Sequence, residues 1–154
     1  MAAAKKKAAK RQNALALLRA DHDLVKDLFD KFEKTRSDDR KGALAERICA
    51  ELTMHAQIEE EVFYPAVREA FREADMDLLD EAEVEHAGAK DLIAQIESSA
   101  PGEELFDAKV TVLGEYVKHH VKEEQNEMFP KVRKTRLDLD ELGERLARRK
   151  AELS

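Results

Sequence analysis

The sequence predicts an all-α protein: an antiparallel up-down four-helix bundle with a short C-terminal fifth helix. Only 5 Gly and 3 Pro occur in 154 residues, while 40% of the residues are charged and 43% are hydrophobic. This composition favours helices. Hydrophobic residues also recur at helical spacing in four long segments, and turn-forming clusters separate those segments. The length suits one domain, so we expect a bundle domain at 13–135, a basic leader at 1–12 and a final helix within 136–154.

The breaks between the segments set the expected helix boundaries. A cap cluster follows Ser37, Asp75 precedes the third segment, and Pro101 suits a helix start because proline lacks the N–H that the first turn leaves unpaired. Asp138 opens the last segment with a capping-box pattern. We therefore expect helices at 13–36, 41–71, 77–97, 103–133 and 138–152.

Charge, cysteine content and hydropathy exclude several classes of protein. Lys and Arg total 27 against 34 Asp and Glu, a net charge of −7, which disfavours nucleic acid as a partner. The single Cys49 cannot form an intramolecular disulfide, and no apolar run approaches a membrane span. The basic N-terminus lacks the apolar segment of a secretory signal. We expect a cytoplasmic protein with no membrane partner.

The hydrophobic residues at helical spacing form one apolar stripe along each of the four long segments, and each stripe contains one histidine. His22, His55, His86 and His120 are separated by 33, 31 and 34 residues. In an up-down bundle, similar lengths of helix on the two sides of a turn return the chain to the same height. The middle interval fits less well, so either the second helix is kinked near Pro65 or its predicted end is misplaced.

Two of these histidines begin a repeated motif. His55 precedes Glu59, and His120 precedes Glu124, by four residues, which puts both side chains of a pair on one helix face. An aromatic-proline step follows both times, with the proline ten residues after the histidine. His119 has a similar partner in Glu123 but not this offset, and it lies off the apolar stripe. We expect His119 at or near the surface and keep it as an alternative ligand.

Four imidazoles and two carboxylates at one level of a bundle point to a metal. A single histidine on an apolar face is ordinarily a hydrogen-bonded core residue. Burying all six groups without compensation, however, costs several kcal/mol per charged group, and the stripes carry no Lys or Arg to pair them. Imidazole and carboxylate donors from four helices suit a dinuclear iron or manganese site.

These residues resemble the hemerythrin-like HHE cation-binding domains. The resemblance spans about 15–133 and rests on Asp21-His22 with Leu28-Phe29, on the run His55 to Pro65, on Val84-Glu85-His86 and on the run His120 to Pro130. It implies a non-heme di-iron centre with an oxo or hydroxo bridge; manganese or a mixed centre is the second choice. It further implies terminal ligands and bridging carboxylates, namely His22, His55, His86 and His120 for the former and Glu59 and Glu124 for the latter.

The chain departs from the oxygen-carrying hemerythrins in one respect. Those proteins use a His-x3-His pair on the third helix, whereas Ala82 and Lys90 stand four residues either side of His86. The missing imidazole leaves a coordination position open to water or to a small ligand. Lys90, Tyr64 and Tyr116 are candidate substitutes. Cys49 lies off the face of His55 and is expected to be an ordinary buried residue.

The resemblance implies a protein that binds or senses dioxygen, or a related small oxidant such as nitric oxide or peroxide. One alternative is a di-iron enzyme of the oxidase, peroxidase or catalase type that consumes these molecules. Another is an iron-responsive or iron-handling regulatory domain, in which metal occupancy orders the bundle for a partner. The plainest alternative is a helical interaction domain without metal. The sequence identifies neither a protein partner nor an oligomeric state.

Overall fold

The structure is a computed structural model that describes residues 12–154; residues 1–11 of the expected basic leader lie outside the described residues. The described chain is helical and contains no strand, which confirms the predicted fold class. Its elements, in order, are α2 (Ala14–Lys34), α3 (Asp38–Ile58), η1 (Glu59–Phe63), α4 (Tyr64–Ala70), η2 (Glu73–Asp75), α5 (Met76–Glu97), α6 (Phe106–Glu123), η3 (Glu124–Met128), α7 (Phe129–Arg133) and α8 (Leu139–Leu153).

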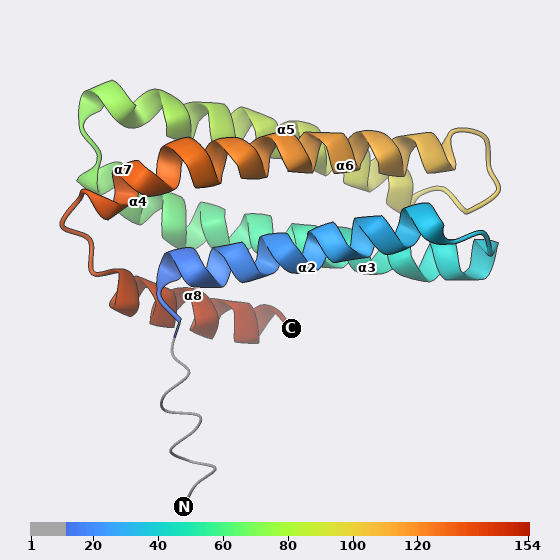
Figure 1. Ribbon diagram of the computed structural model, residues 1–154, viewed down its shortest axis with the longest axis horizontal. Coiled ribbons are helices and arrows are strands. Elements are labelled where there is room, and N and C mark those ends of the chain that lie inside the picture. Colours follow the sequence, from blue (N-terminus) through green and yellow to red (C-terminus); the bar gives the residue numbers. More distant parts are fainter. Residues whose placement is uncertain (1–11) are drawn as a thin grey trace, which may run out of the picture.

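Two antiparallel helix pairs make the bundle (Figure 1). α2 packs on α3, and α5 packs on α6, with fewer contacts between the pairs than within them. The α2–α3 and α5–α6 connections lie at the same end of the molecule. The fifth helix that the sequence predicts is α8, and it lies outside the bundle against α2 and α3.

Side-chain caps fix three of the helix starts. Asn13, Ser37 and Asp138 each accept a hydrogen bond from the backbone N–H three residues later, at 2.9, 3.4 and 3.0 Å. Short polar side chains at these positions satisfy donors that the first helical turn leaves unpaired. The first, second and fifth helices therefore begin within three residues of their predicted starts.

The fourth helix begins three residues later than predicted, and Pro101 does not start it. Residues 98–105 form a series of turns, and the helix begins at Phe106. Backbone N–H groups of Glu103 and Phe106 donate to the carbonyls three residues earlier, at 3.1 Å each, which closes turns and not helical rings. Leu105 has a φ of 73°, a left-handed conformation that a helix cannot contain.

The second and fourth helices each contain a π turn that the sequence analysis did not predict. The backbone N–H of Tyr64 donates to the carbonyl of Glu59, and that of Phe129 donates to Glu124, five residues back in both cases. Pro65 follows directly, and Pro130 does so in the other helix; neither has the N–H that continued α-helical bonding requires. The irregularity expected near Pro65 is thus a π turn, and the second helix ends at Ala70.

A polar layer divides the apolar core in two. One apolar cluster, with Phe63, Val67 and Leu146, lies towards α4, α7 and α8, and the other, with Ile48 and Leu113, lies towards the α2–α3 and α5–α6 connections. Along each bundle helix the histidine falls between residues of the two clusters. The buried polar or charged side chains of the described part all belong to this layer: Asp21, His22, His55, Glu59, His86 and Glu124.

The helix α8 packs over the polar layer on the side formed by α2, α3 and η1. Its Leu142 and Leu146 are buried, and Gly143 packs so closely on the start of α2 that a Cβ there would lie 2.8 Å from the backbone nitrogen of Ala14. Lys150 forms an ion pair with Asp21, and Arg149 pairs with Glu61 at 2.7 Å.

Across residues 12–154, every helix is too short or too polar to cross a membrane.

Candidate metal centre

The six residues singled out from the sequence meet at one level of the bundle. The four histidines come from α2, α3, α5 and α6, and the two glutamates come from the π turns η1 and η3. Glu59 is fully buried and Glu124 is 2% exposed. The π turns matter here because each begins at the glutamate, four residues after the histidine of the same helix. The donor atoms divide into two groups, called here the first and the second position.

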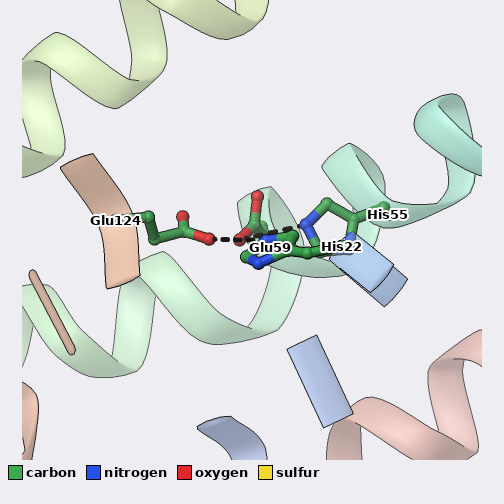
Figure 2. Close-up of side chains that lie close together, drawn as sticks. All are labelled: His22, His55, Glu59 and Glu124. Carbon is green, nitrogen blue, oxygen red and sulfur yellow. Dashed lines mark ion pairs between the residues drawn. The ribbon is translucent and has the colours of Figure 1, made fainter. Parts of the chain in front are cut away.

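The first position is formed by His22, His55, Glu59 and Glu124, whose side chains point towards one another (Figure 2). Their four donor atoms all lie within 4.8 Å of one another. His22 Nε2 is 3.1 Å from a Glu124 oxygen, and His55 Nε2 is 3.4 Å from a Glu59 oxygen. All four atoms are buried and none makes a hydrogen bond. Donors about 2.1 Å from a shared metal lie about 3 Å apart at right angles, so this spacing fits a cation.

The second position is formed by His86 and His120 with the other oxygens of the same two carboxylates. His86 Nε2 is 3.1 Å from Glu59 Oε1, and His120 Nε2 is 3.4 Å from Glu124 Oε2. The hydroxyl of Tyr64 lies among these four atoms. It donates to Glu124 at 2.6 Å, is 3.2 Å from Glu59, and is 3.4 Å from both imidazole nitrogens.

Each carboxylate therefore divides its two oxygens between the two positions. Glu59 presents Oε2 to the first position and Oε1 to the second. Glu124 presents Oε1 to the first position and Oε2 to the second. This is the arrangement required of a carboxylate that bridges two metal ions.

The outward nitrogen of every central histidine has a partner. His55 Nδ1 meets Asp21 at 2.8 Å, and the other three contacts measure 2.7 Å: His86 with Glu60, His120 with Glu85, and His22 with Gln125. Partners of this kind fix the ring orientation, leave Nε2 facing inwards and raise the basicity of a ligating imidazole.

No role was predicted from the sequence for these four partners. A signal was present, because a carboxylate directly precedes His22 and His86, and Glu60 and Gln125 directly follow the two glutamates. In each case the partner contacts the Nδ1 of a histidine on another helix. Spacing along one helix does not reveal such a contact.

The electrostatics of the centre favour bound positive charge. Burial opposes protonation of His55, but Glu59 and Asp21 outweigh it and raise the pKa of this ring to about 10. Burial likewise opposes protonation of His120, whose pKa Glu124 and Glu85 raise to about 11. Burial would raise the pKa of Glu124, yet His120 and His22 hold it well below its ordinary value. Protons thus balance the carboxylates when metal is absent, and cations can replace them.

The remaining candidates lie away from the donor atoms. The His119 side chain is 67% exposed and pairs with Glu123 at 3.4 Å. Lys90 pairs with Glu60 at 2.7 Å, and Tyr116 is half exposed. Cys49 is buried among apolar residues, where burial raises the pKa of its thiol to about 11. Of the three candidate substitutes for the missing imidazole, only Tyr64 reaches the centre.

Comparison with known proteins decides the family. The family model described as "Hemerythrin HHE cation binding domain" matches residues 13–132. The chain belongs to the hemerythrin HHE family. The resemblance inferred from the motifs is thereby confirmed, and cation binding in this HHE domain agrees with the two clusters of histidine and glutamate donors.

Two relatives of this HHE chain illustrate its neighbours. A crystal structure of a hemerythrin HHE cation binding domain-containing protein from Mycobacterium kansasii, an Rv2633c homolog, superposes with a TM-score of 0.77 at 27% identity, covering 92% of this chain and 87% of that one. A protein named DNA nickase from Nostoc sp. (strain PCC 7120 / SAG 25.82 / UTEX 2576) is 32% identical over 122 residues. That match covers 79% of this chain but spans about a third of the relative, 34% of its length.

Proposed function

We propose that this chain holds a carboxylate-bridged non-heme di-iron centre and uses it to bind or sense dioxygen or a related small oxidant, such as nitric oxide or peroxide. The observation that carries the proposal is the division of the Glu59 and Glu124 oxygens between two pairs of histidines. A mononuclear site does not need two shared carboxylates.

The donor set supports iron. It consists of imidazole nitrogens and carboxylate oxygens, with the phenol oxygen of Tyr64 beside them. Thiolate donors, which select copper(I) and zinc, are absent from the described centre, since Cys49 lies in the apolar cluster. Bound iron would supply reversible electron transfer to an oxidant. Manganese uses the same donors and remains the second choice.

The two positions differ in the number of protein donors. The first has two imidazoles and two carboxylate oxygens within 4.8 Å of one another. The second has two imidazoles and one Glu59 oxygen in such a group, with a Glu124 oxygen and the Tyr64 hydroxyl beside them. We propose that Tyr64 takes the place of the imidazole that oxygen-carrying hemerythrins have and this chain lacks. The first position then keeps the more open coordination, and a small ligand would bind there.

A di-iron enzyme of the oxidase or peroxidase type is the second candidate function. Tyr64 favours it, because this hydroxyl holds a proton 2.6 Å from Glu124, and burial together with the two carboxylates raises its pKa well above the ordinary value. A buried proton donor beside the metals suits turnover more than reversible binding. The nicking activity in the relative's name is not supported for this chain, because the match spans 34% of that protein and the net charge of −7 disfavours binding to DNA.

Metal analysis and an optical spectrum test the proposal. The protein is purified aerobically, reduced without oxygen and exposed to oxygen again. Near two irons per chain, with a near-ultraviolet band that bleaches on reduction and returns, is the expected result. Return without net oxygen consumption indicates binding or sensing, and continuous consumption in the presence of a reductant indicates an enzyme. Failure to take up iron after anaerobic reconstitution would reject both.

A further inference from the structure

A cavity of about 490 Å³ borders the histidine side of the centre. All four central histidines line it, whereas Glu59, Glu124 and Tyr64 do not. The cavity therefore touches the centre from the side opposite the bridging carboxylates. It extends between the two helix pairs towards the α2–α3 and α5–α6 connections.

The wall of this cavity is apolar. Val25 comes from α2, Leu52 from α3, Ile93 from α5 and Val117 from α6, so every bundle helix contributes an aliphatic side chain. A dioxygen molecule needs far less room. An engineered apolar cavity of roughly 150 Å³ accommodates benzene, and pockets for small organic ligands begin at roughly 300 Å³.

The edge of the cavity is apolar as well. Val84 is 73% exposed and Tyr116 is 51% exposed, and both line the cavity. They are two of the four large hydrophobic side chains exposed in the described chain. Exposed apolar side chains at the rim of a pocket are a feature of ligand-binding sites.

The charged groups along the cavity are already paired. Lys90 binds Glu60, Asp21 binds His55 and Lys150, and Glu85 binds His120. His119 is held by Glu123. None of these groups is left to neutralise a charged ligand, whose burial here would carry a desolvation penalty without compensation.

We infer that this cavity binds an uncharged, apolar organic molecule larger than benzene, in contact with the imidazoles of the centre. The inference deepens the proposed function, since it names a class of substrate or effector for the same site. Binding itself needs only the cavity, so it can be tested without iron.

Fluorescence titration with two matched probes tests the inference. N-phenyl-1-naphthylamine is uncharged, and 1-anilinonaphthalene-8-sulfonate has the same ring system with a sulfonate. Each is titrated into metal-free and zinc-loaded full-length protein. Saturable binding of one N-phenyl-1-naphthylamine per chain is expected in both forms, and in the metal-free form it should be at least tenfold tighter than that of the sulfonate, because no metal charge attracts the sulfonate there. No saturable binding, or preference for the sulfonate in the metal-free form, would overturn the inference.

Two cavity-filling variants locate the probe. Ala89→Phe places a ring into the cavity from α5, and Leu52→Trp fills it from α3. Each is expected to weaken N-phenyl-1-naphthylamine binding at least tenfold, while Ala94→Phe, on an exposed position of α5 that does not line the cavity, leaves it unchanged. Circular dichroism identifies any variant that fails to fold. Unchanged binding in a folded cavity-filling variant would place the probe elsewhere and overturn the inference. Because iron is not used, loss of the di-iron proposal would leave this result standing.

Discussion

The two halves of the centre are related by an approximate repeat but differ where the repeat fails. Asp21, His22, His55 and Glu59 in the first half correspond to Glu85, His86, His120 and Glu124 in the second. In both halves the acid before the first histidine binds the second histidine, and the glutamate begins a π turn. The shared framework therefore places two positions of similar shape side by side.

The repeat fails at two pairs of residues, and both differences give the second position the stronger electron donors. Glu60 supports His86 with a charge, whereas its counterpart Gln125 supports His22 with a neutral amide. Tyr64 brings a hydroxyl to the second position, whereas its counterpart Phe129 stacks on His22 with ring centroids 6.3 Å apart. The difference teaches that one repeated scaffold can give two clusters of donor atoms unequal electron donation.

The largest effect is expected from a residue that both positions share. Glu124→Gln replaces one of the two inward oxygens with an amide nitrogen and removes the charge, so iron content should fall from near two to below one per chain. Glu123→Gln, at the half-buried neighbouring position that pairs with His119, is the matched control and should retain two. Iron analysis of both variants decides. Full occupancy in Glu124→Gln would contradict the bridging role.

Moving the Tyr64 hydroxyl from the second position to the first should reverse part of the difference in donor groups between the two positions. Tyr64→Phe removes the phenol from the second position, and we expect about tenfold weaker binding of one of the two metals, with loss of visible absorption from a phenolate-to-iron(III) transition. The double variant Tyr64→Phe/Phe129→Tyr moves the hydroxyl to the corresponding place beside His22. Stepwise metal titration with an absorption spectrum measures both. A Tyr64→Phe spectrum identical to the original would remove Tyr64 from the ligand set.

Changing the charge of either histidine partner, Gln125 or Glu60, should make the two positions more alike. Gln125→Glu gives His22 a charged partner and should lower the reduction potential of the first iron, because a more basic imidazole stabilises the oxidised metal. Glu60→Gln should weaken metal binding at the second position by about tenfold. Redox titration of the first variant and metal titration of the second check these outcomes. An unchanged reduction potential in Gln125→Glu would mean that the charge of the partner has no effect.

The stability of the metal-free protein and its affinity for metal should change in opposite directions as pH rises. In the metal-free protein the pKa values of His55 and His120 are raised to about 10 and 11. Their contribution to stability is complete below the ordinary histidine pKa of about 6.5 and disappears as pH rises through the raised values. Metal binding requires neutral imidazoles, so metal affinity should increase with pH over the same range. Urea unfolding of the metal-free form and metal titration at several pH values measure the two slopes, and parallel slopes would be inconsistent with this centre.

The smallest effect is expected from the outermost cations. Lys150 of α8 pairs with Asp21 behind His55, and Lys90 pairs with Glu60 behind His86. Lys150→Met and Lys90→Met should each weaken metal binding at the nearer position by about fivefold at most, as expected for partly exposed ion pairs. Site-resolved metal titration separates the two variants. A larger loss for either one would show that the cation acts directly on the centre.

Helical periodicity and capping residues predicted the bundle well, because both are local properties of the chain. The four stripes also placed His22, His55, His86 and His120 at one level. The π turns escaped prediction, since spacing along a helix does not show which carbonyl a backbone N–H selects. Pro101 misled for a related reason: the turns around it are closed by the Glu103 side chain and by backbone bonds that the sequence does not display.

The residues around the donors were harder to predict than the donors themselves. Asp21 and Glu85 each contact a histidine on the neighbouring helix, so their role depends on how the helices pack. Tyr64 was one of three candidates near the site, and its hydroxyl reaches the second position from the residue that directly follows the π turn η1. Side-chain geometry across helices supplied what the spacing left open.

Mössbauer spectroscopy of protein reconstituted with iron-57 tests the central claim most directly. Two bridged positions with unequal donors predict near two irons per chain and two quadrupole doublets of equal area, from a coupled diferric pair. Tyr64→Phe should shift one doublet and leave the other in place. A spectrum of isolated high-spin iron, or a single iron per chain, would contradict the account.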